Sequence, residues 1–389
     1  MGRALRDHLP MGPGAASSPF SPPGRGGGSR TRGPPPQTET IMTASPFDHP
    51  FLSGLLGDNE IAPYFSAEAD IRAMLSFEAA LAKAEAAHGL IPAEAARRIA
   101  ETCAAFSPEV SNLRSATARD GVVVPDLIKQ LRASVGEEAA KSLHFGATSQ
   151  DIIDTSLMIR LKAVVFLFAG RLSTIAAGLH ALDGQFGRNK LIGHTRMQAA
   201  IPITVSDRLR AWREPLATYR DRLTEQGFPV QFGGAAGTLD KLGSQAATIR
   251  ASLAQELGLT DAPQWQSGRL PIADIAGLFA SISGSLGKMG QDIALLAQAG
   301  DEIEISGGGT SSAMAHKQNP VSAEVLISLA RFNATLLSGI HQSLVHEQER
   351  SGAAWTLEWL LLPQMTMATA ASLRLAKELT GNIKRLGTT

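Results

Sequence analysis

The chain has only one cysteine, Cys103, among its 389 residues. A single thiol excludes an intrachain disulfide framework and a metal site built from several thiolates of one chain. Cys103 stands at helical spacing from Ile99 and Phe106, so we expect a buried core residue rather than a nucleophile. We expect neither a metal nor a cofactor.

An excess of charge of either sign is also absent, since 36 Lys and Arg balance 36 Asp and Glu. No basic stripe is interleaved with aromatic residues, which argues against a nucleic-acid partner. No uninterrupted apolar run reaches the roughly 18 to 20 residues of a membrane span. We therefore expect a soluble, cytoplasmic protein with no membrane contact, whose partners are small molecules and further copies of itself.

Aromatic residues make up only 5% of the chain, and alternating strand patterns are scarce. Apolar residues instead recur at three-four spacing from residue 66 onward, which predicts helices almost throughout. Residues 1–41 differ, because they are rich in Pro, Gly and Arg and lack an apolar pattern. This composition predicts a disordered extension upstream of a start at Met42. We expect an N-terminal helical domain over 42–148 and a long-helix bundle over 149–389.

Three apolar segments are unusually long, at about 151–182, 271–304 and 320–346. A final helical segment follows at 355–384, with a kink expected at Pro363. A helix of 30 residues spans roughly 45 Å, more than a compact domain needs. Apolar residues lie on several faces of these segments, so each helix requires more than one neighbour. We predict an all-α fold, an elongated bundle that one chain does not complete.

The most informative segment is the glycine-rich run 306–320. Its glycines allow many backbone conformations, Lys317 adds a positive charge, and Asn319 and Pro320 predict the N-cap and first residue of a helix. The free N–H groups of a helix start attract anions. The run therefore predicts a segment that can hold an anion and move a proton. A flexible linker is the alternative for the glycines alone.

Two further polar clusters precede helices. The first combines the side chains of His144, Thr148, Ser149 and Gln150, at the start of a long helix. It predicts a second anion site, although Thr148 or Ser149 could serve only as an N-cap. The second cluster contains His194 and Arg196, for which a solvated turn is the alternative interpretation.

Together the three clusters resemble the fumarase/aspartase superfamily, whose signature is a Gly-rich loop followed by two serines, Met, Lys and Asn-Pro. The block Thr148–Asp151 matches a second signature, and the resemblance covers residues 46–385. Within the superfamily the chain is most similar to the bacterial 3-carboxy-cis,cis-muconate cycloisomerase family. That similarity lies in the segments 45–48, 231–238 and 348–355.

The resemblance implies an intramolecular lyase that lactonises 3-carboxy-cis,cis-muconate to 4-carboxymuconolactone in protocatechuate catabolism. It also implies a homotetramer whose active sites combine three subunits. Ser311 matches the proton-transferring serine, Lys317 matches the residue that stabilises the aci-carboxylate, and His144 is a further catalytic candidate. The tricarboxylate substrate would contact Thr148, Ser149, Gln150, His194, Arg196, Gln231, Asn319, Glu324 and Arg350.

The chain departs from the superfamily pattern in three places. Ala315 replaces the usual proline of the signature, and we expect a fold that lacks the usual small C-terminal domain. The second block normally reads Gly-Arg-Thr-His, but here His194 takes the arginine position and Arg196 the histidine position. A leaving carboxylate needs no general acid, so this loss disfavours a lyase that expels an amine. Three alternatives remain: an adenylosuccinate- or argininosuccinate-type lyase releasing fumarate, a 3-sulfomuconate cycloisomerase, and a non-enzymatic structural member of the fold.

Overall fold

The structure is a computed structural model that describes residues 44–310 and 318–389. Residues Thr43–Thr389 group as one compact unit, which contains every element named below. Its first part holds α1 (Ser53–Leu56), η1 (Ala62–Phe65), α2 (Ala67–Ala87), α3 (Ala93–Ala105), α4 (Val110–Asp120), α5 (Val124–Val135) and α6 (Glu137–Ala140).

The second part holds the long helices and all the strands. The helices are α7 (Ser149–Phe186), α8 (Val205–Glu225), η2 (Asp240–Gln245), α9 (Ala246–Leu257), α10 (Leu270–Ala299), α11 (Val321–Gln342) and α12 (Gly352–Asn382). The strands are β1 (Lys190–Thr195), β2 (Gln198–Thr204), β3 (Ile303–Ile305), β4 (Gly309–Thr310), β5 (Gln318–Asn319) and β6 (Ile383–Leu386).

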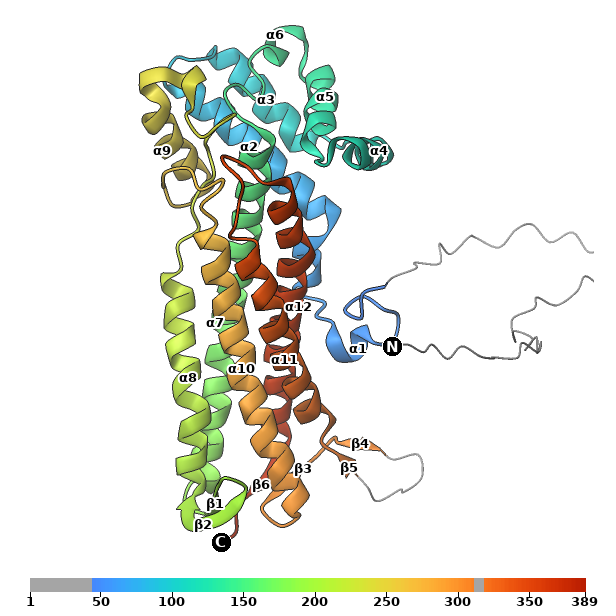
Figure 1. The fold of residues 1–389 in the computed structure, drawn as a ribbon, viewed down its shortest axis with the longest axis vertical. Coiled ribbons are helices and arrows are strands. Elements are labelled where there is room, and N and C mark those ends of the chain that lie inside the picture. Colours follow the sequence, from blue (N-terminus) through green and yellow to red (C-terminus); the bar gives the residue numbers. More distant parts are fainter. Residues whose placement is uncertain (1–43, 311–317) are drawn as a thin grey trace, which may run out of the picture. The chain divides into compact units, whose positions relative to one another are not determined.

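Five long helices, α7, α8, α10, α11 and α12, run along one another as a bundle (Figure 1). Their inward faces form one apolar core, in which the rings of Phe168 and Phe279 meet edge to face with centroids 5.3 Å apart. The 38 residues of α7 correspond to about 57 Å of helix. The predicted all-α bundle is therefore confirmed, and Cys103 is buried in a second core as expected.

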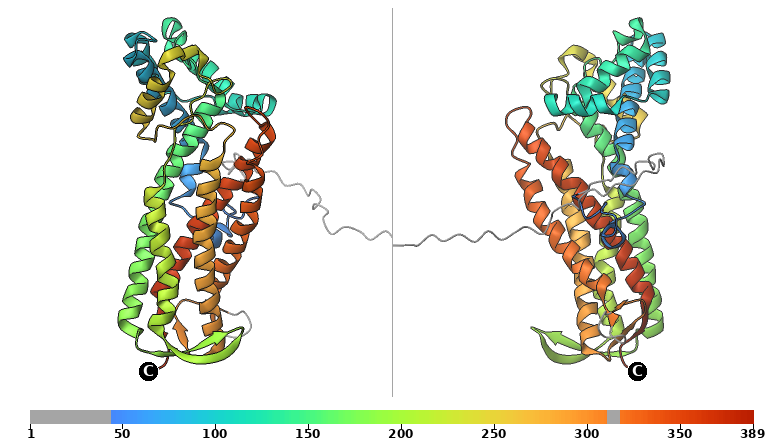
Figure 2. Two further views of the ribbon diagram at one scale, coloured as in Figure 1. Left: turned by 60° about the vertical axis from the view of Figure 1, so that its left-hand side comes forward. Right: turned by 90° about the vertical axis from the view of Figure 1, so that its right-hand side faces the viewer.

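The second apolar core joins α2, α3 and α5 to the later helix α9. Figure 2 places α9 beside the helices of the N-terminal part, away from the middle of the bundle. The division into 42–148 and 149–389 stays a prediction, but the apolar packing groups α9 with the earlier helices, although it follows α7 and α8 in the chain. Packing, rather than chain order, decides where that helix lies.

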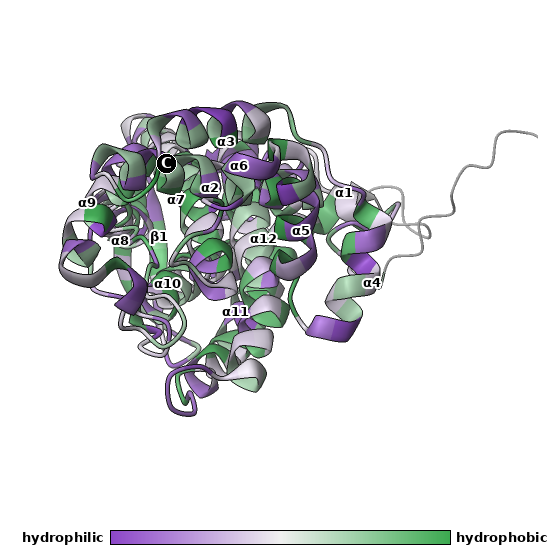
Figure 3. Cartoon of the chain, turned by 90° about the horizontal axis from the view of Figure 1, so that it is seen from above, coloured by the Kyte–Doolittle hydropathy of each residue, from purple (hydrophilic) through white to green (hydrophobic). Residues whose placement is uncertain are grey.

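The helices α10 and α11 are long and apolar enough, by length and composition alone, to cross a membrane. In α10, 56% of the most apolar window is buried, whereas in α11 the buried share is 28%. Figure 3 looks along the bundle and shows apolar residues on both helices. The two helices pack on each other, and α10 also packs on α8 and α12, as core helices of a bundle do. The lower burial of α11 leaves part of an apolar helix without a neighbour among the residues that the structure describes.

Two local expectations need correction. Residues 190–204 form an antiparallel hairpin, β1–β2, which the sequence analysis did not foresee. Pro320, not Asn319, occupies the N-cap of α11, because Asn319 pairs with Gly309 as part of β5. Helix α12 contains Pro363 in its interior, and the kink expected there stays a prediction.

Candidate active site

Hydrogen bonds from backbone N–H groups to the carboxylate of Asp151 hold the start of α7. Thr148 is the N-cap residue, and its N–H donates to Asp151 Oδ2 at 3.0 Å. The same carboxylate accepts from the N–H groups of Gly233 and Gly234 at 2.8 and 2.9 Å. Ser149 then opens the helix. The predicted helix start is present, and Asp151 ties it to the loop after residue 230.

Burial raises the pKa of Asp151 to about 6, while hydrogen bonds from Gly233, Gln231, Gly234 and Thr148 act in the opposite direction. Gln231 is fully buried, and both the nitrogen and the oxygen of its side-chain amide form hydrogen bonds. Its Nε2 donates to Asp151 Oδ1 at 3.1 Å, and its Oε1 accepts from the Trp265 N–H at 2.7 Å. In this arrangement Gln231 holds the loop that faces the helix start.

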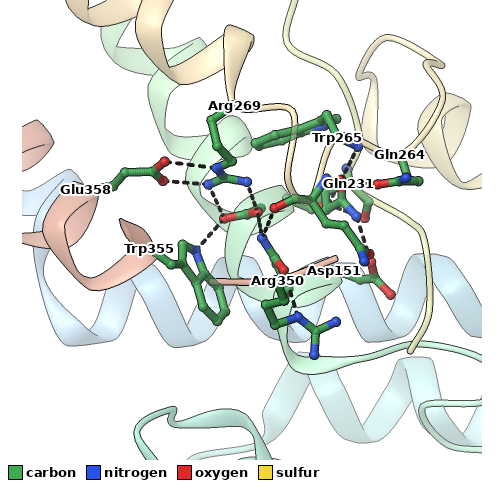
Figure 4. A network of polar contacts seen from close by, with 12 residues as sticks. Asp151, Gln231, Gln264, Trp265, Arg269, Arg350, Trp355 and Glu358 are labelled. Atoms are coloured by element: carbon green, nitrogen blue, oxygen red, sulfur yellow. Dashed lines mark hydrogen bonds and ion pairs between the residues drawn. The ribbon is translucent and has the colours of Figure 1, made fainter. Parts of the chain in front are cut away.

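Arg350 reaches the same place from the segment between α11 and α12. Its Nε donates to Gln150 Oε1 at 2.9 Å, and its Nη2 donates to the carbonyl of Ala235 at 3.3 Å. Gln150 is fully buried, whereas Arg350 is exposed. A guanidinium at the positive end of a helix is a strong site for a carboxylate. The structure therefore brings Thr148, Ser149, Gln150, Gln231 and Arg350 together (Figure 4 shows the polar network).

His144 lies just before this helix start in a left-handed backbone conformation, with φ of 60°. Its Nδ1 is 2.7 Å from Oε1 of the buried Glu78. A further carboxyl group, that of Glu85, is fully buried and has no hydrogen-bond partner among the described residues. Burial, together with the charge of Glu78, raises the pKa of Glu85 to about 9. His144 therefore contacts one of two buried carboxyl groups, Glu78, whose charge also acts on the other, Glu85.

His194 and Arg196 lie elsewhere, in the β1–β2 hairpin that Figure 1 places at the far end of the bundle. Arg196 and Met197 form its two-residue turn, and both have positive φ, 50° and 66°. Hairpin turns of this kind favour Asn and Gly, whereas this turn carries two long side chains. Both predicted residues are exposed and line a cavity of about 470 Å³. That cavity is also bordered by Arg208, Lys288, Asp292 and Glu302.

The remaining predicted residues belong to the glycine-rich run and the helix after it. Ser311 and Lys317 lie outside the described residues. Asn319 is in β5, and Glu324 is exposed in the first turn of α11. Figure 1 shows β4 and β5 at the same end of the bundle as the hairpin. One chain therefore separates two groups of predicted residues. Gln150 and Arg350 lie at the start of α7, and His194 and Arg196 follow its end, about 57 Å of helix away.

The sequence analysis did not identify a buried ionic cluster beneath Gln150. Arg269 bonds Asp154 through both Nη atoms, at 2.5 and 3.0 Å, and bonds Glu358 through Nε at 2.9 Å and Nη2 at 2.6 Å. Trp355 Nε1 donates to Asp154 Oδ1 at 3.0 Å (Figure 4). The one sequence signal was the spacing of Gln150 and Asp154, which puts both on one face of α7. Among the described residues no group of three His, Cys, Asp or Glu side chains could hold a metal ion.

Comparison with known proteins gives a consistent result. A family model described as Lyase matches residues 58–332. The chain is 36% identical to the 3-carboxy-cis,cis-muconate cycloisomerase of Bradyrhizobium diazoefficiens over 337 residues, covering 83% of this chain and 74% of the relative. It is 38% identical to the enzyme of the same name from Pseudomonas aeruginosa over 323 residues, with coverage of 80% and 70%.

A solved structure agrees with these relatives. The crystal structure of 3-carboxy-cis,cis-muconate lactonizing enzyme from Pseudomonas putida matches with a TM-score of 0.80 and 34% identity, covering 86% of this chain and 77% of that one. Sequence and fold therefore lead to the same group of proteins. The chain belongs to the lyase family of the fumarase/aspartase superfamily.

Proposed function

We propose that this protein is a 3-carboxy-cis,cis-muconate cycloisomerase, which closes its substrate to 4-carboxymuconolactone. The observation that carries the proposal is the exposed guanidinium of Arg350 fixed on Gln150 at the N-terminus of α7. Such a site suits a substrate with several carboxylates. The relatives of that name at 36% and 38% identity support the choice of substrate.

In this reaction a carboxylate oxygen of the substrate forms a C–O bond to the ring-forming carbon. The electron pair of the attacked double bond moves toward the distal carboxylate, which becomes an aci-carboxylate, and a proton is then added to the carbon beside it. We assign that proton transfer to Ser311 and the stabilisation of the aci-carboxylate to Lys317, with His144 as a further proton-transfer group. A serine needs nearby positive charge to act in this way, and Lys317 supplies it.

Arg196 has a binding role in this proposal. The planar guanidinium of an arginine suits bidentate binding of a carboxylate. Ring closure in this enzyme neither expels nor recaptures an amine, so no acid is required at that position. Arg196 and His194 would instead hold one of the three carboxylates, with Asn319 and Glu324 as neighbouring polar groups.

We further propose a cytoplasmic homotetramer with sites assembled from three subunits. The separation of Gln150 and Arg350 from His194 and Arg196 by the length of α7 supports this, since one chain cannot close a site around both groups. The partly uncovered apolar helix α11 would then pack against other copies of the chain.

A spectrophotometric assay tests the proposed function. Addition of purified protein to 3-carboxy-cis,cis-muconate should remove the absorbance of the conjugated diene and give 4-carboxymuconolactone. Faster turnover of 3-sulfomuconate would reassign the substrate, and release of fumarate from adenylosuccinate or argininosuccinate would refute the cycloisomerase. Ser311→Ala should lower kcat by orders of magnitude in a folded protein.

A further inference from the structure

We propose that the buried cluster of Asp154, Arg269 and Glu358 is a positioning device for Arg350, and that Asp154 acts on it through the side chain of Gln150. The inference rests on the proposed function only in naming Arg350 as a substrate-binding residue. None of the three cluster residues would contact the substrate. They would fix the place at which the guanidinium of Arg350 meets it.

The contacts form a continuous path from the cluster to Arg350. Arg269 grips the carboxylate of Asp154 with both Nη atoms, at 2.5 and 3.0 Å. Asp154 Oδ2 accepts from Gln150 Nε2 at 3.1 Å, and Gln150 Oε1 accepts from Arg350 Nε at 2.9 Å. Figure 4 labels Arg269 and Arg350, the two ends of this path. Each step of the path is a hydrogen bond from a nitrogen donor to an oxygen acceptor.

The amide of Gln150 has only one favourable orientation in this path. Its Nε2 faces two acceptors, Asp154 Oδ2 and the carbonyl oxygen of Gln266 at 2.7 Å. A flipped amide would turn its oxygen toward both acceptors and its NH₂ group toward the guanidinium of Arg350. The acceptor charge of Asp154 therefore keeps an oxygen, rather than a donor, directed at Arg350.

The cluster itself is rigid because it is sealed from water. The side-chain exposed fractions are 0% for Arg269, 1% for Asp154 and 2% for Glu358. The guanidinium of Arg269 also lies 4.6 Å from the ring centroid of Trp265. Charged groups buried in this way hold a geometry firmly only when fully paired, and here Glu358 supplies the second carboxylate that Arg269 needs.

The structure offers a matched pair of variants, Asp154→Ala and Glu358→Ala. Each removes one buried carboxylate from Arg269, so we expect similar losses of thermal stability. Of the two residues only Asp154 contacts Gln150, so Asp154→Ala should raise KM for the muconate about tenfold, with a smaller change in kcat. Glu358→Ala keeps that contact and only loosens Arg269, so it should raise KM clearly less than Asp154→Ala does. An unchanged KM in folded Asp154→Ala, or an equal rise in both variants, would overturn the inference.

A double-mutant cycle isolates the path. In an Arg350→Lys background the Nε contact to Gln150 no longer exists, so adding Asp154→Ala should raise KM no further. Additive effects would show that Asp154 acts independently of Arg350. If the alanine variants do not fold, the isosteric pair Asp154→Asn and Glu358→Gln replaces them in the same comparison.

A structural measurement separates this inference from the proposed function. In a crystal structure of Asp154→Asn, Arg350 Nε should lie beyond hydrogen-bond distance of Gln150 Oε1, whereas in Glu358→Gln that contact should persist. An intact contact in Asp154→Asn would refute the positioning role. Failure of the wild-type protein to lactonise the muconate would refute the proposed function alone, because the two crystal structures would still decide this inference.

Discussion

Arg196 occupies a turn position that its side chain does not favour. A positive φ at a residue with a Cβ costs about 1 kcal/mol, and Arg196 and Met197 both have this conformation. We explain this strained turn by a need for the guanidinium of Arg196 to project from the end of the hairpin. A glycine substituted at either turn position therefore allows the effect of backbone strain to be told apart from the effect on substrate binding.

We predict that Arg196→Gly relaxes the turn and leaves Tm unchanged or slightly raised, while KM for the muconate rises at least about tenfold. Met197→Gly is the matched control, because it relieves the same kind of strain and keeps the guanidinium. Its KM should stay near that of the wild-type protein. Steady-state kinetics and thermal unfolding of both variants measure these effects, and a normal KM in Arg196→Gly would exclude the binding role.

Glu85 links pH to stability. Its pKa in the folded protein is about 9, against 4.5 for an ordinary glutamate, so the folded state holds a proton that the unfolded state has released over that interval. The contribution of this group is therefore fully favourable below pH 4.5, and stability falls as pH rises toward 9. The slope for one such group is about 1.4 kcal/mol per pH unit.

We predict that Glu85→Gln removes this slope. Urea unfolding at pH 5.5 and pH 8.5 should show a loss of stability with rising pH that is smaller in the variant than in the wild-type protein. Glu68→Gln, at an exposed position, is the control and should keep the wild-type slope. Parallel pH dependence in wild type and Glu85→Gln would mean that Glu85 is ionised in the folded protein at neutral pH.

At the scale of the elements, the bundle depends on the close approach of α10 and α11. A Cβ added to Gly287 would lie 2.4 Å from the Cβ of Ala330 and 3.1 Å from the carbonyl oxygen of Leu326. Real Cβ atoms do not approach other atoms so closely, and much of the contact is with a backbone that cannot rotate away. The absence of a side chain at Gly287 therefore sets the distance between the two helices.

We predict that Gly287→Ala destabilises the protein by about 1 to 3 kcal/mol through overpacking, although alanine is the better helix former. Gly284, one turn earlier in α10, has open space around its Cβ position. Gly284→Ala should therefore stabilise by about 0.5 to 1 kcal/mol. Chemical denaturation of the two variants compares them directly, and effects of the same sign would contradict this account of the helix contact.

At the scale of the whole molecule, the two groups of site residues lie at opposite ends of one bundle. If several chains assemble each site, one chain supplies Arg350 and another supplies Arg196. A mixture of two inactive variants can then contain intact sites, because the chain that lacks one arginine still carries the other. This consequence follows from the length of α7 and does not depend on the details of the chemistry.

We predict that co-expression of Arg196→Ala and Arg350→Ala in equal amounts restores roughly a quarter of wild-type activity, since chance assembly leaves about one site in four with both residues. Each variant alone should be nearly inactive, and mixing the separately purified tetramers without dissociation should restore nothing. Sedimentation should give a tetramer. An active monomer, or no recovery in co-expressed tetramers, would exclude shared sites.

Much of the architecture was set by local sequence. Three-four apolar spacing predicted the long helices, and Thr148 and the residues after it predicted the start of α7, because helix formation and capping involve neighbours only a few positions apart. The resemblance carried by the glycine-rich run and the Thr148–Asp151 block identified the superfamily. The sequence also predicted that Cys103 is a core residue and not a nucleophile, because its neighbours at helical spacing are apolar. The structure buries it.

The tertiary structure decided what depends on distant partners. The pairing of Arg269 with Asp154 and Glu358 joins residues 115 and 89 positions apart, so no local pattern could reveal it. Hairpin 190–204 formed because two short segments pair with each other, a choice that strand propensity alone does not make. The wide separation of Arg196 from Arg350 likewise emerged only when α7 was placed in the bundle, since spacing along a chain does not fix distance in space.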